Sequence, residues 1–188
     1  MELAQLRLEH ETALCEFLAD FAAADETDIP AYFADPTWSH AEIVEAFARQ
    51  SRGEGLAEGW VPGSTLFLVH EGHILGVANL RHRLTDHLTR FGGHVGFSVR
   101  PSERCKGYAA CLLDLVKEYV LRSELGIDRL LVTCHSANAA SARVIEKCGG
   151  ILEDESYYEP EKHSVRRYWI PLRDSRTVSK AKQERPGS

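Results

Sequence analysis

An apolar strand that passes through a short basic turn into an apolar helix is the feature that most constrains the fold of this chain. The strand is HVGFSV (residues 94–99), and the turn after it contains Arg104, Lys106 and Gly107. The helix has one apolar face at helical spacing, formed by Ala109, Leu112, Leu113, Val116 and Val120. The next strand, RLLVTCH (residues 129–135), completes a strand–helix–strand crossover. Such a unit joins two parallel strands, so we expect both to lie in one sheet.

The rest of the chain supplies the other elements of that sheet. Before the crossover, the sequence predicts a strand at residues 3–8, a helix from Glu11, a second helix that begins with a capping box of Ser39 and Glu42, and a hairpin with its turn at Glu71-Gly72. After it come a short helix, NAASARVIEK, and two strands, ILEDESYY and VRRYWIPL. We therefore predict a single α/β (α+β) domain over residues 1–172, with a mixed, mostly antiparallel central sheet flanked by helices. The polar segment 173–188 is predicted to be a disordered tail.

Composition excludes several classes of protein. The chain has 188 residues, which suits one domain, and its formal net charge of -6 argues against a general nucleic-acid binder. No apolar run is long enough to span a bilayer, and the first residues lack the order of a secretory signal, so we expect a cytoplasmic protein without a membrane partner. The five cysteines form no CxxC pair and the nine histidines form no HExxH motif, so we expect no metal site.

The basic turn has the components of a phosphate site. The first N–H groups of a helix have no partner within the helix, and their dipoles attract anions. Gly107 leaves room for a phosphate and permits unusual dihedral angles, and Ala109 keeps the next turn narrow. Arg104 and Lys106 add positive charge. The Walker and Rossmann glycine patterns are both absent, and the simplest alternative is a strand–helix turn that happens to be charged.

Two motifs in this region resemble the GNAT superfamily of acyl-CoA-dependent N-acyltransferases. Residues 104–109, RCKGYA, match its Q/R-x-x-G-x-G/A signature and lie, as in that superfamily, between a strand and a helix. Downstream, the segment from Asn138 to Gly149 resembles its N-x-x-[AS]-x-x-x-x-x-K-x-G helix. The two motifs occur in the expected order with a strand between them. The resemblance covers about residues 64–170 and is to a bacterial branch of the superfamily.

The resemblance implies a fold in which two central strands diverge and acetyl-CoA lies in the gap. Its pantetheine arm would pair with the backbone of the strand that ends at Val99, around Phe97, Ser98 and Val99. Its pyrophosphate would lie on the turn formed by Arg104, Cys105, Lys106, Gly107, Tyr108 and Ala109. Asn138 and Ser141 would face the arm from the other side. Taken singly, Gly107 is also explained as a turn glycine and Asn138 as a helix N-cap.

Transfer of an acetyl group to an amine requires a base, oxyanion stabilisation and a proton for the leaving thiolate. Relatives often carry a Glu near the start of the central strand. Here His94 occupies that region and is the candidate base, the alternative being a partly buried histidine bonded to a loop. Many relatives have a tyrosine acid where this chain has Ile145. Tyr157 or Tyr158 is therefore the candidate acid, against the alternatives of ordinary strand aromatics or no acid at all.

These features together predict an N-acetyltransferase. It would move an acetyl group from acetyl-CoA to a primary amine of a small molecule or peptide by direct attack in a ternary complex, rather than through a cysteine carrier. A small amine, an amino acid, an aminoglycoside and a protein N-terminus all stay open as acceptors. The residues around Arg81 and the loop with Trp60 either line the acceptor side or are ordinary solvated residues. The alternative classes are a non-catalytic acyl-CoA-sensing module and a nucleotide-binding protein, and a homodimer also stays open.

Overall fold

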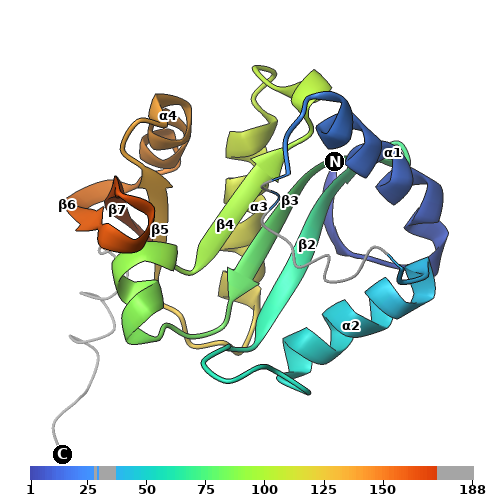
Figure 1. Ribbon diagram of the computed structural model, residues 1–188, viewed down its shortest axis with the longest axis horizontal. Coiled ribbons are helices and arrows are strands. Elements are labelled where there is room, and N and C mark those ends of the chain that lie inside the picture. Colours follow the sequence, from blue (N-terminus) through green and yellow to red (C-terminus); the bar gives the residue numbers. More distant parts are fainter. Residues whose placement is uncertain (28, 30–36, 173–188) are drawn as a thin grey trace, which may run out of the picture.

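A computed structural model describes residues 1–27, 29 and 37–172, and Figure 1 shows how they are arranged. The strands are β1 (Glu2–Gln5), β2 (Gly63–His70), β3 (His73–Arg81), β4 (Val95–Val99), β5 (Arg129–His135), β6 (Ile151–Tyr158) and β7 (His163–Pro171). The α-helices are α1 (Glu11–Ala23), α2 (His40–Arg52), α3 (Tyr108–Arg122) and α4 (Ala139–Lys147). The shorter turns are η1 (Leu8–His10), the π-helical η2 (Leu88–Gly92), η3 (Pro101–Glu103) and η4 (Glu159–Glu161). The predicted disordered tail, residues 173–188, lies outside the described residues.

One mixed sheet runs through the molecule. Its seven strands have the order β1-β2-β3-β4-β5-β7-β6. Strands β4 and β5 are parallel and joined by α3, whereas every other neighbouring pair is antiparallel. The predicted crossover and the single α/β domain with a mostly antiparallel sheet are therefore confirmed. The first strand is shorter than residues 3–8, because the chain turns into η1 soon after Gln5.

Helix α2 begins as the sequence predicts. The backbone N–H of Glu42 donates to Oγ of Ser39 at 3.3 Å, and Oε2 of Glu42 accepts from the backbone N–H of Ser39 at 2.7 Å. This capping box satisfies two N–H groups that would otherwise lack partners. The helix ends at Gly53, whose φ of 77° reverses the chain direction.

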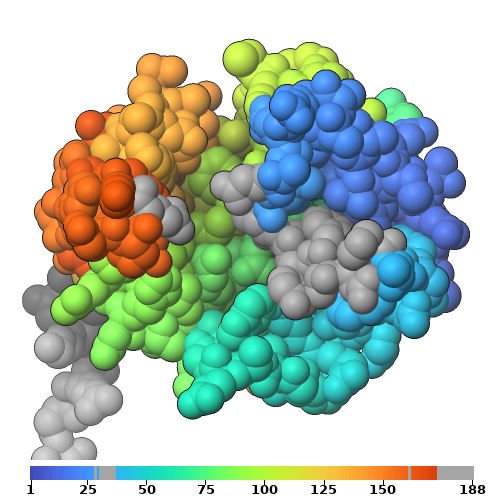
Figure 2. Space-filling view, in the orientation of Figure 1, coloured from blue at the N-terminus to red at the C-terminus, as the bar shows by residue number. Residues whose placement is uncertain are grey.

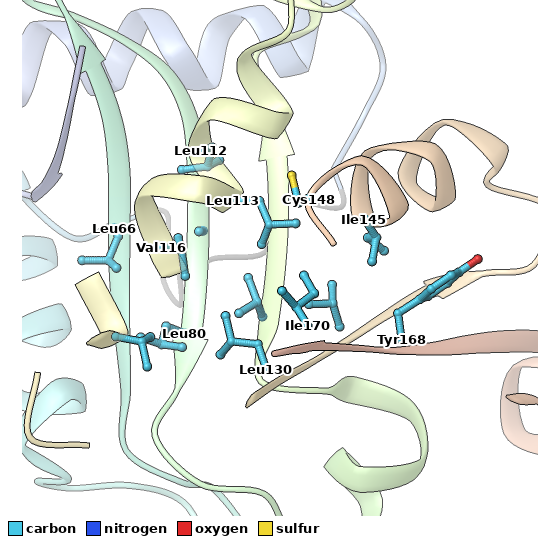
Figure 3. Packing of buried hydrophobic residues seen from close by; sticks show 14 of the residues in the cluster. Leu66, Leu80, Leu112, Leu113, Val116, Leu130, Ile145, Cys148, Tyr168 and Ile170 are labelled. Carbon is cyan, nitrogen blue, oxygen red and sulfur yellow. The ribbon is translucent and has the colours of Figure 1, made fainter. Parts of the chain in front are cut away.

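Apolar side chains fill both faces of the sheet. On one face, Phe17 and Phe21 of α1 and Phe47 of α2 pack against β2 and β3, including Phe67. On the other face, the predicted apolar side of α3 packs against the sheet together with α4. Figure 3 shows part of this second cluster, with Leu112, Leu113 and Val116 of α3 beside residues of β2, β3, β5 and α4. Burial of these side chains is what fixes the helices on the sheet.

The chain reaches β4 differently from the prediction. The strand predicted at residues 94–99 is β4, which begins at Val95, but the π-helical η2, which ends at Gly92, was not predicted. Between them, Gly93 has a φ of 63°, and a Cβ added there would lie 2.6 Å from the carbonyl oxygen of Leu131. The backbone of this connection therefore approaches β5 more closely than any side chain would allow.

Candidate functional site

Strands β4 and β5 separate soon after they meet. Their register contains a single pair, Val95 with Val132, although β4 is the central strand of the sheet order. The middle of β4, residues 96–98, is accordingly half-buried rather than buried. Figure 2 shows the surface hollowed between the part formed by α4, β6 and β7 and the part formed by α1. The sheet is thus open along the second half of β4, on the side that faces β5; we call this opening the gap.

The hydrogen-bond alternation of β4 shows which backbone groups face the gap. The carbonyl of His94 accepts from the N–H of Arg81, and the N–H of Arg100 donates to the carbonyl of Leu75, so even-numbered residues bond to β3. In an antiparallel pair the alternate residues direct their N–H and C=O groups to the other side. Phe97 and Val99 therefore direct their backbone groups into the gap, as expected for residues that pair with an extended ligand.

Ser98 differs from its two neighbours. It pairs with Val77 of β3, so its backbone groups belong to the β3–β4 ladder rather than to the gap. Paired residues share a face of the sheet, and Val77 belongs to the cluster under α1 and α2. The side chain of Ser98 therefore lies on that face. A contact of Ser98 with a ligand through its backbone is not favoured by this geometry.

The turn between β4 and α3 leaves the N-terminus of α3 open. Gly107 is the N-cap residue, has a φ of 87° and provides no side-chain cap, and the first helical bond runs from the N–H of Cys111 to the carbonyl of Gly107. The N–H groups of Tyr108 and Ala109 thus lie in the first turn, where an α-helix offers no internal acceptor. A Cβ added at Gly107 would meet nothing within 4 Å. Space and donors for an anion coincide here.

Cys105 also has a left-handed backbone, with a φ of 63°. For a residue other than glycine, this conformation costs about 1–2 kcal/mol. The side chain is exposed, so burial of the thiol does not offset that cost. The strained residue lies within the turn that the signature predicts to hold the pyrophosphate, and backbone strain often accumulates at binding sites.

The two cations of the turn are both paired. The guanidinium of Arg104 donates to both carboxylate oxygens of Glu26 at 2.6 Å, and its Nε donates to the carbonyl of Val99 at 3.2 Å. The hydrogen bonds between the two side chains stabilise both charges, so they lower the pKa of Glu26 and raise the pKa of Arg104. Lys106 pairs with Glu103 at 2.9 Å but is exposed. Arg104 therefore braces the turn, and its contact with a phosphate stays a prediction.

Helix α1 holds the start of the same connection. Asp20 accepts hydrogen bonds from Nε of Arg100 at 2.9 Å and from the backbone N–H and hydroxyl of Ser102 at 3.2 and 2.7 Å. Bonds from Ser102 and Arg100 lower the pKa of Asp20. With the Glu26–Arg104 pair, this makes two links from α1 and the residues after it to the turn. The turn is consequently fixed before any ligand arrives.

The opposite side of the gap is formed by the start of α4. Asn138 is the N-cap residue, and its Oδ1 accepts from the backbone N–H of Ser141 at 2.9 Å. Asn138 is exposed and Ser141 is half-buried. The capping role of Asn138 is thereby confirmed, whereas the contact of both residues with a pantetheine arm stays a prediction.

His94 lies in a different environment from that of a typical base. It is buried, and its Nδ1 accepts a hydrogen bond of 2.9 Å from the backbone N–H of Leu131. The backbone N–H of His94 in turn donates to the carbonyl of Leu131 at 2.7 Å. Burial, together with the charge of Arg81, lowers the pKa of His94 to about 4. This geometry favours a structural role, in which a neutral imidazole joins the start of β4 to β5; the role as base stays a prediction.

The two tyrosines of β6 differ in exposure. Tyr157 is 56 % exposed, whereas Tyr158 is half-buried and packs its ring 4.3 Å from that of Phe91. The rings of His87 and His163 lie 5.8 Å from Tyr158. As alternation along a strand requires, only one of the adjacent pair packs inward, and that one is Tyr158. Its role as an acid stays a prediction.

A pocket of about 520 Å³ lies beside the gap, and we call it the Arg81 pocket. It lies between the end of β3, the loop before β2 and the segment around η2, and its lining includes Trp60, Val61, Asn79, Arg81, His87 and Leu88. The sequence suggested Arg81 and the loop with Trp60 as candidate acceptor-side residues. Asn79 was missed, and its only signal was a lone amide inside the apolar strand HILGVANLR.

The described part of the chain contains neither a metal site nor a membrane span. Across residues 1–27, 29 and 37–172, no three His, Cys, Asp or Glu side chains gather closely enough to hold a metal ion. Within the same part of the chain, no helix is both long and apolar enough to cross a bilayer.

The family model of the acetyltransferase (GNAT) domain matches residues 1–151. No curated protein matches by sequence.

Three of the similar solved structures illustrate the fold. One is a spermidine N-acetyltransferase mutant from Vibrio cholerae, with 15% identity, a TM-score of 0.58, and coverage of 92% of this chain and 95% of that one. A protein from Salmonella typhimurium solved with its cofactor acetyl-CoA has 18% identity, a TM-score of 0.57 and coverage of 92% and 94%. A ribosomal L7/L12 alpha-N-protein acetyltransferase in complex with coenzyme A has 18% identity, a TM-score of 0.61 and coverage of 90% and 92%.

Proposed function

Because the chain belongs to the GNAT acetyltransferase family, we propose that it transfers the acetyl group of acetyl-CoA to a primary amine, by direct attack in a ternary complex. Acetyl-CoA is the acetyl donor of this family. The observation that carries the proposal is the combination of the gap beside β4 with the open N-terminus of α3 at one end of that strand. The neighbours named for spermidine and for a ribosomal protein support a small amine or a peptide amine as the acceptor class.

The donor's arm would replace the missing strand next to β4. Phe97 offers its N–H and C=O groups and Val99 offers its N–H, at the spacing of a strand, and an extended chain of amides can pair with them; the carbonyl of Val99 already accepts from Arg104. The phosphates would lie at the first turn of α3, against the N–H groups of Tyr108 and Ala109 and the open space above Gly107. The thioester would then lie near the middle of β4, because the arm runs from the turn back along that strand.

The backbone of β4 would also stabilise the oxyanion. When an amine attacks the thioester carbonyl, the oxygen gains negative charge and a fixed N–H donor lowers the barrier. The N–H of Phe97 faces the gap and is rigidly held by the β3–β4 ladder. One such donor typically contributes about 3 kcal/mol.

The amine is proposed to lose its proton to bulk solvent before the attack and to enter the open gap as its neutral fraction. The conjugate acid of an alkyl amine has a pKa of about 10.4, so a base that titrates near 4 has little driving force to take its proton. The bond from Leu131 also occupies the lone pair of His94 Nδ1. The leaving thiolate needs no strong acid, because a thiol pKa is about 8.5. If a protein acid contributes, Tyr158 is the better placed of the two tyrosines.

The release of coenzyme A tests the proposal. Purified protein is mixed with acetyl-CoA and a panel of amines, and free thiol is measured with a chromogenic disulfide. Acetyl-CoA binding is measured separately by titration calorimetry. Amine-dependent thiol release supports the transferase. Tight acetyl-CoA binding with no release across the panel would favour the alternative, a module that senses acyl-CoA.

A further inference from the structure

The Arg81 pocket opens toward the reacting end of the proposed donor site. Asn79, one of its lining residues, pairs with Gly96 of β4, so the two strands carry these residues side by side on the same face. Gly96 has no side chain, and adjacent strands lie about 4.8 Å apart. No side chain of residue 96 therefore separates the pocket from the middle of β4. A molecule in the pocket can reach the thioester position across this glycine.

Arg81 brings an uncompensated positive charge to this pocket. Its side chain is half-buried, and its Nη1 donates to the carbonyls of Gly92 at 3.0 Å and Gly93 at 3.3 Å. Neutral carbonyls do not cancel a charge. Among the residues that the structure describes, no carboxylate pairs with Arg81, although the other half-buried arginines, Arg100, Arg166 and Arg167, are each paired with a carboxylate. A cation removed from water without a counter-ion is costly, so the pocket favours an anion.

The free edge of the guanidinium has the geometry for that anion. Both of its hydrogen bonds use Nη1, which leaves Nε and Nη2 without a partner in the described part of the chain. Neither atom is among the fully buried unpartnered side-chain atoms there, which are Oγ of Ser136 and Nε1 of Trp169. Nε and Nη2 are therefore not fully buried, and together they form the edge that binds a carboxylate through two parallel bonds.

We propose that the acceptor is an amine that also carries a carboxylate, such as an amino acid, and that Arg81 binds this carboxylate. The proposal rests on the function proposed above, and it deepens that function by naming the chemical class of the acceptor. Trp60 and Val61, which line the pocket, would cover the apolar part of the molecule, and Asn79, which also lines it, would lie between the carboxylate and the thioester. The amine is then delivered toward Gly96, where no side chain blocks it.

A diamine is the competing class, because Glu58 also lines the pocket. That carboxylate is exposed, so water already solvates it and it gains little from a ligand cation. Arg81 is less accessible to water and gains more from a counter-ion. The relative exposure of the two charges thus favours an anionic group on the acceptor over a second cationic one.

Matched acceptor pairs test the proposal. Glycine, β-alanine, γ-aminobutyrate and several larger α-amino acids are each compared with the corresponding carboxamide, which has nearly the same shape but no negative charge. The amine of a carboxamide is less basic, so a larger fraction is unprotonated at neutral pH and reactivity without recognition favours the carboxamide. We expect kcat/KM for at least one acid to exceed that for its carboxamide by about tenfold to a hundredfold.

Variants assign that preference to one side chain. Arg81→Gln is expected to bring the ratio of kcat/KM for the acid to kcat/KM for the carboxamide close to one. Arg81→Lys keeps the charge but cannot form the two parallel bonds, so it should give an intermediate ratio. Glu58→Gln removes a charge of opposite sign from the same pocket and should leave the preference for the acid in place. Thermal unfolding and acetyl-CoA affinity of each variant report whether the connection held through Gly92 and Gly93 is intact.

The outcomes separate this inference from the proposed function. Efficient thiol release with carboxamides and simple amines, and a ratio near or below one for every pair, would overturn the role of Arg81 and leave the transferase standing. If no amine releases thiol, the transferase fails. Calorimetric titration of the same acids and carboxamides then decides the inference alone: binding of an acid, lost in Arg81→Gln, supports it, and equal or absent binding of both members of every pair refutes it.

Discussion

Acid should destabilise this protein through His94 before its paired carboxylates are affected. The neutral imidazole accepts a bond from the N–H of Leu131 where β4 meets β5, and it is buried beside the charge of Arg81. Protonation removes the lone pair that accepts this bond and places a second cation near Arg81. The variant that isolates the effect is His94→Asn, because an asparagine Oδ1 can occupy the position of Nδ1 and accept the same bond without titrating.

The magnitude follows from the two pKa values. The folded value is about 4, and the unfolded value is about 6.5. Since the folded pKa is the lower one, the contribution of this group to stability is complete above pH 6.5 and is lost as the pH falls toward 4. The loss is about 2 kcal/mol at pH 5 and about 3 kcal/mol below pH 4. Carboxylates such as Asp20, whose pKa is lowered, take up their protons mainly below this window.

Urea unfolding at pH 7 and pH 5 measures the effect. Between the two pH values, the wild type should lose about 2 kcal/mol more of its free energy of unfolding than His94→Asn does. His94→Ala should lose about 1–3 kcal/mol already at pH 7, because it leaves the N–H of Leu131 unpaired. Equal pH dependence of the wild type and His94→Asn would refute the environment described for His94. A hundredfold fall of kcat in a stable His94→Asn variant would instead support the role as base.

The remaining predictions concern the donor site, the candidate acids and the tail. Gly107→Val should abolish the stabilisation by acetyl-CoA, which is about 2.7 kcal/mol at a hundredfold excess over Kd. Gly107→Ala has the same backbone strain from a positive φ but a smaller side chain, so the calorimetric affinities of the two variants separate strain from lost space. Wild-type affinity in a folded Gly107→Val variant would contradict the phosphate site. Tyr158→Phe should reduce kcat by about 100-fold or more if that hydroxyl is the acid, and Tyr157→Phe should not; full rates in both would leave solvent as the proton source. A chain that ends at Arg173 should keep its melting temperature and acetyl-CoA affinity, and a large fall in either would show that the tail docks.

Local chemistry explains which parts of the fold could be predicted from the sequence. The capping box of Ser39 and Glu42, the apolar side of α3 and the glycine at the start of α3 each depend on residues close in sequence. Their signals are therefore complete within a short segment. The strand–helix–strand order also predicted the crossover, and the gap was implied by the resemblance to the GNAT superfamily.

The features that the sequence did not predict depend on contacts between residues far apart in the chain. Sequence patterns did not show that Arg104 pairs with Glu26, 78 residues away, or that His94 bonds to Leu131. In the structure, the residue expected to attract phosphate also braces the turn and the candidate base also joins two strands, while their roles in binding and catalysis stay predictions. The turn η2 was missed because a π-helical segment has no simple periodicity, and the requirement for Gly93 comes from the nearby carbonyl of Leu131.

The single residue pair between β4 and β5 also determines how the molecule holds itself together. The seven strands form a group of four, β1-β2-β3-β4, and a group of three, β5-β7-β6, which a single residue pair joins in the sheet. Helix α3 connects the two groups of strands. It packs on β3 and β4, and Nζ of its residue Lys117 donates to the carbonyl of Cys148, at the end of α4, at 3.0 Å. The two groups of strands are thus joined mainly by apolar packing on the face of the sheet that α3 covers. Helix α3 therefore has two roles in the proposed donor site. Its first N–H groups would bind the phosphates, and its packing on the sheet sets the width of the gap for the donor's arm.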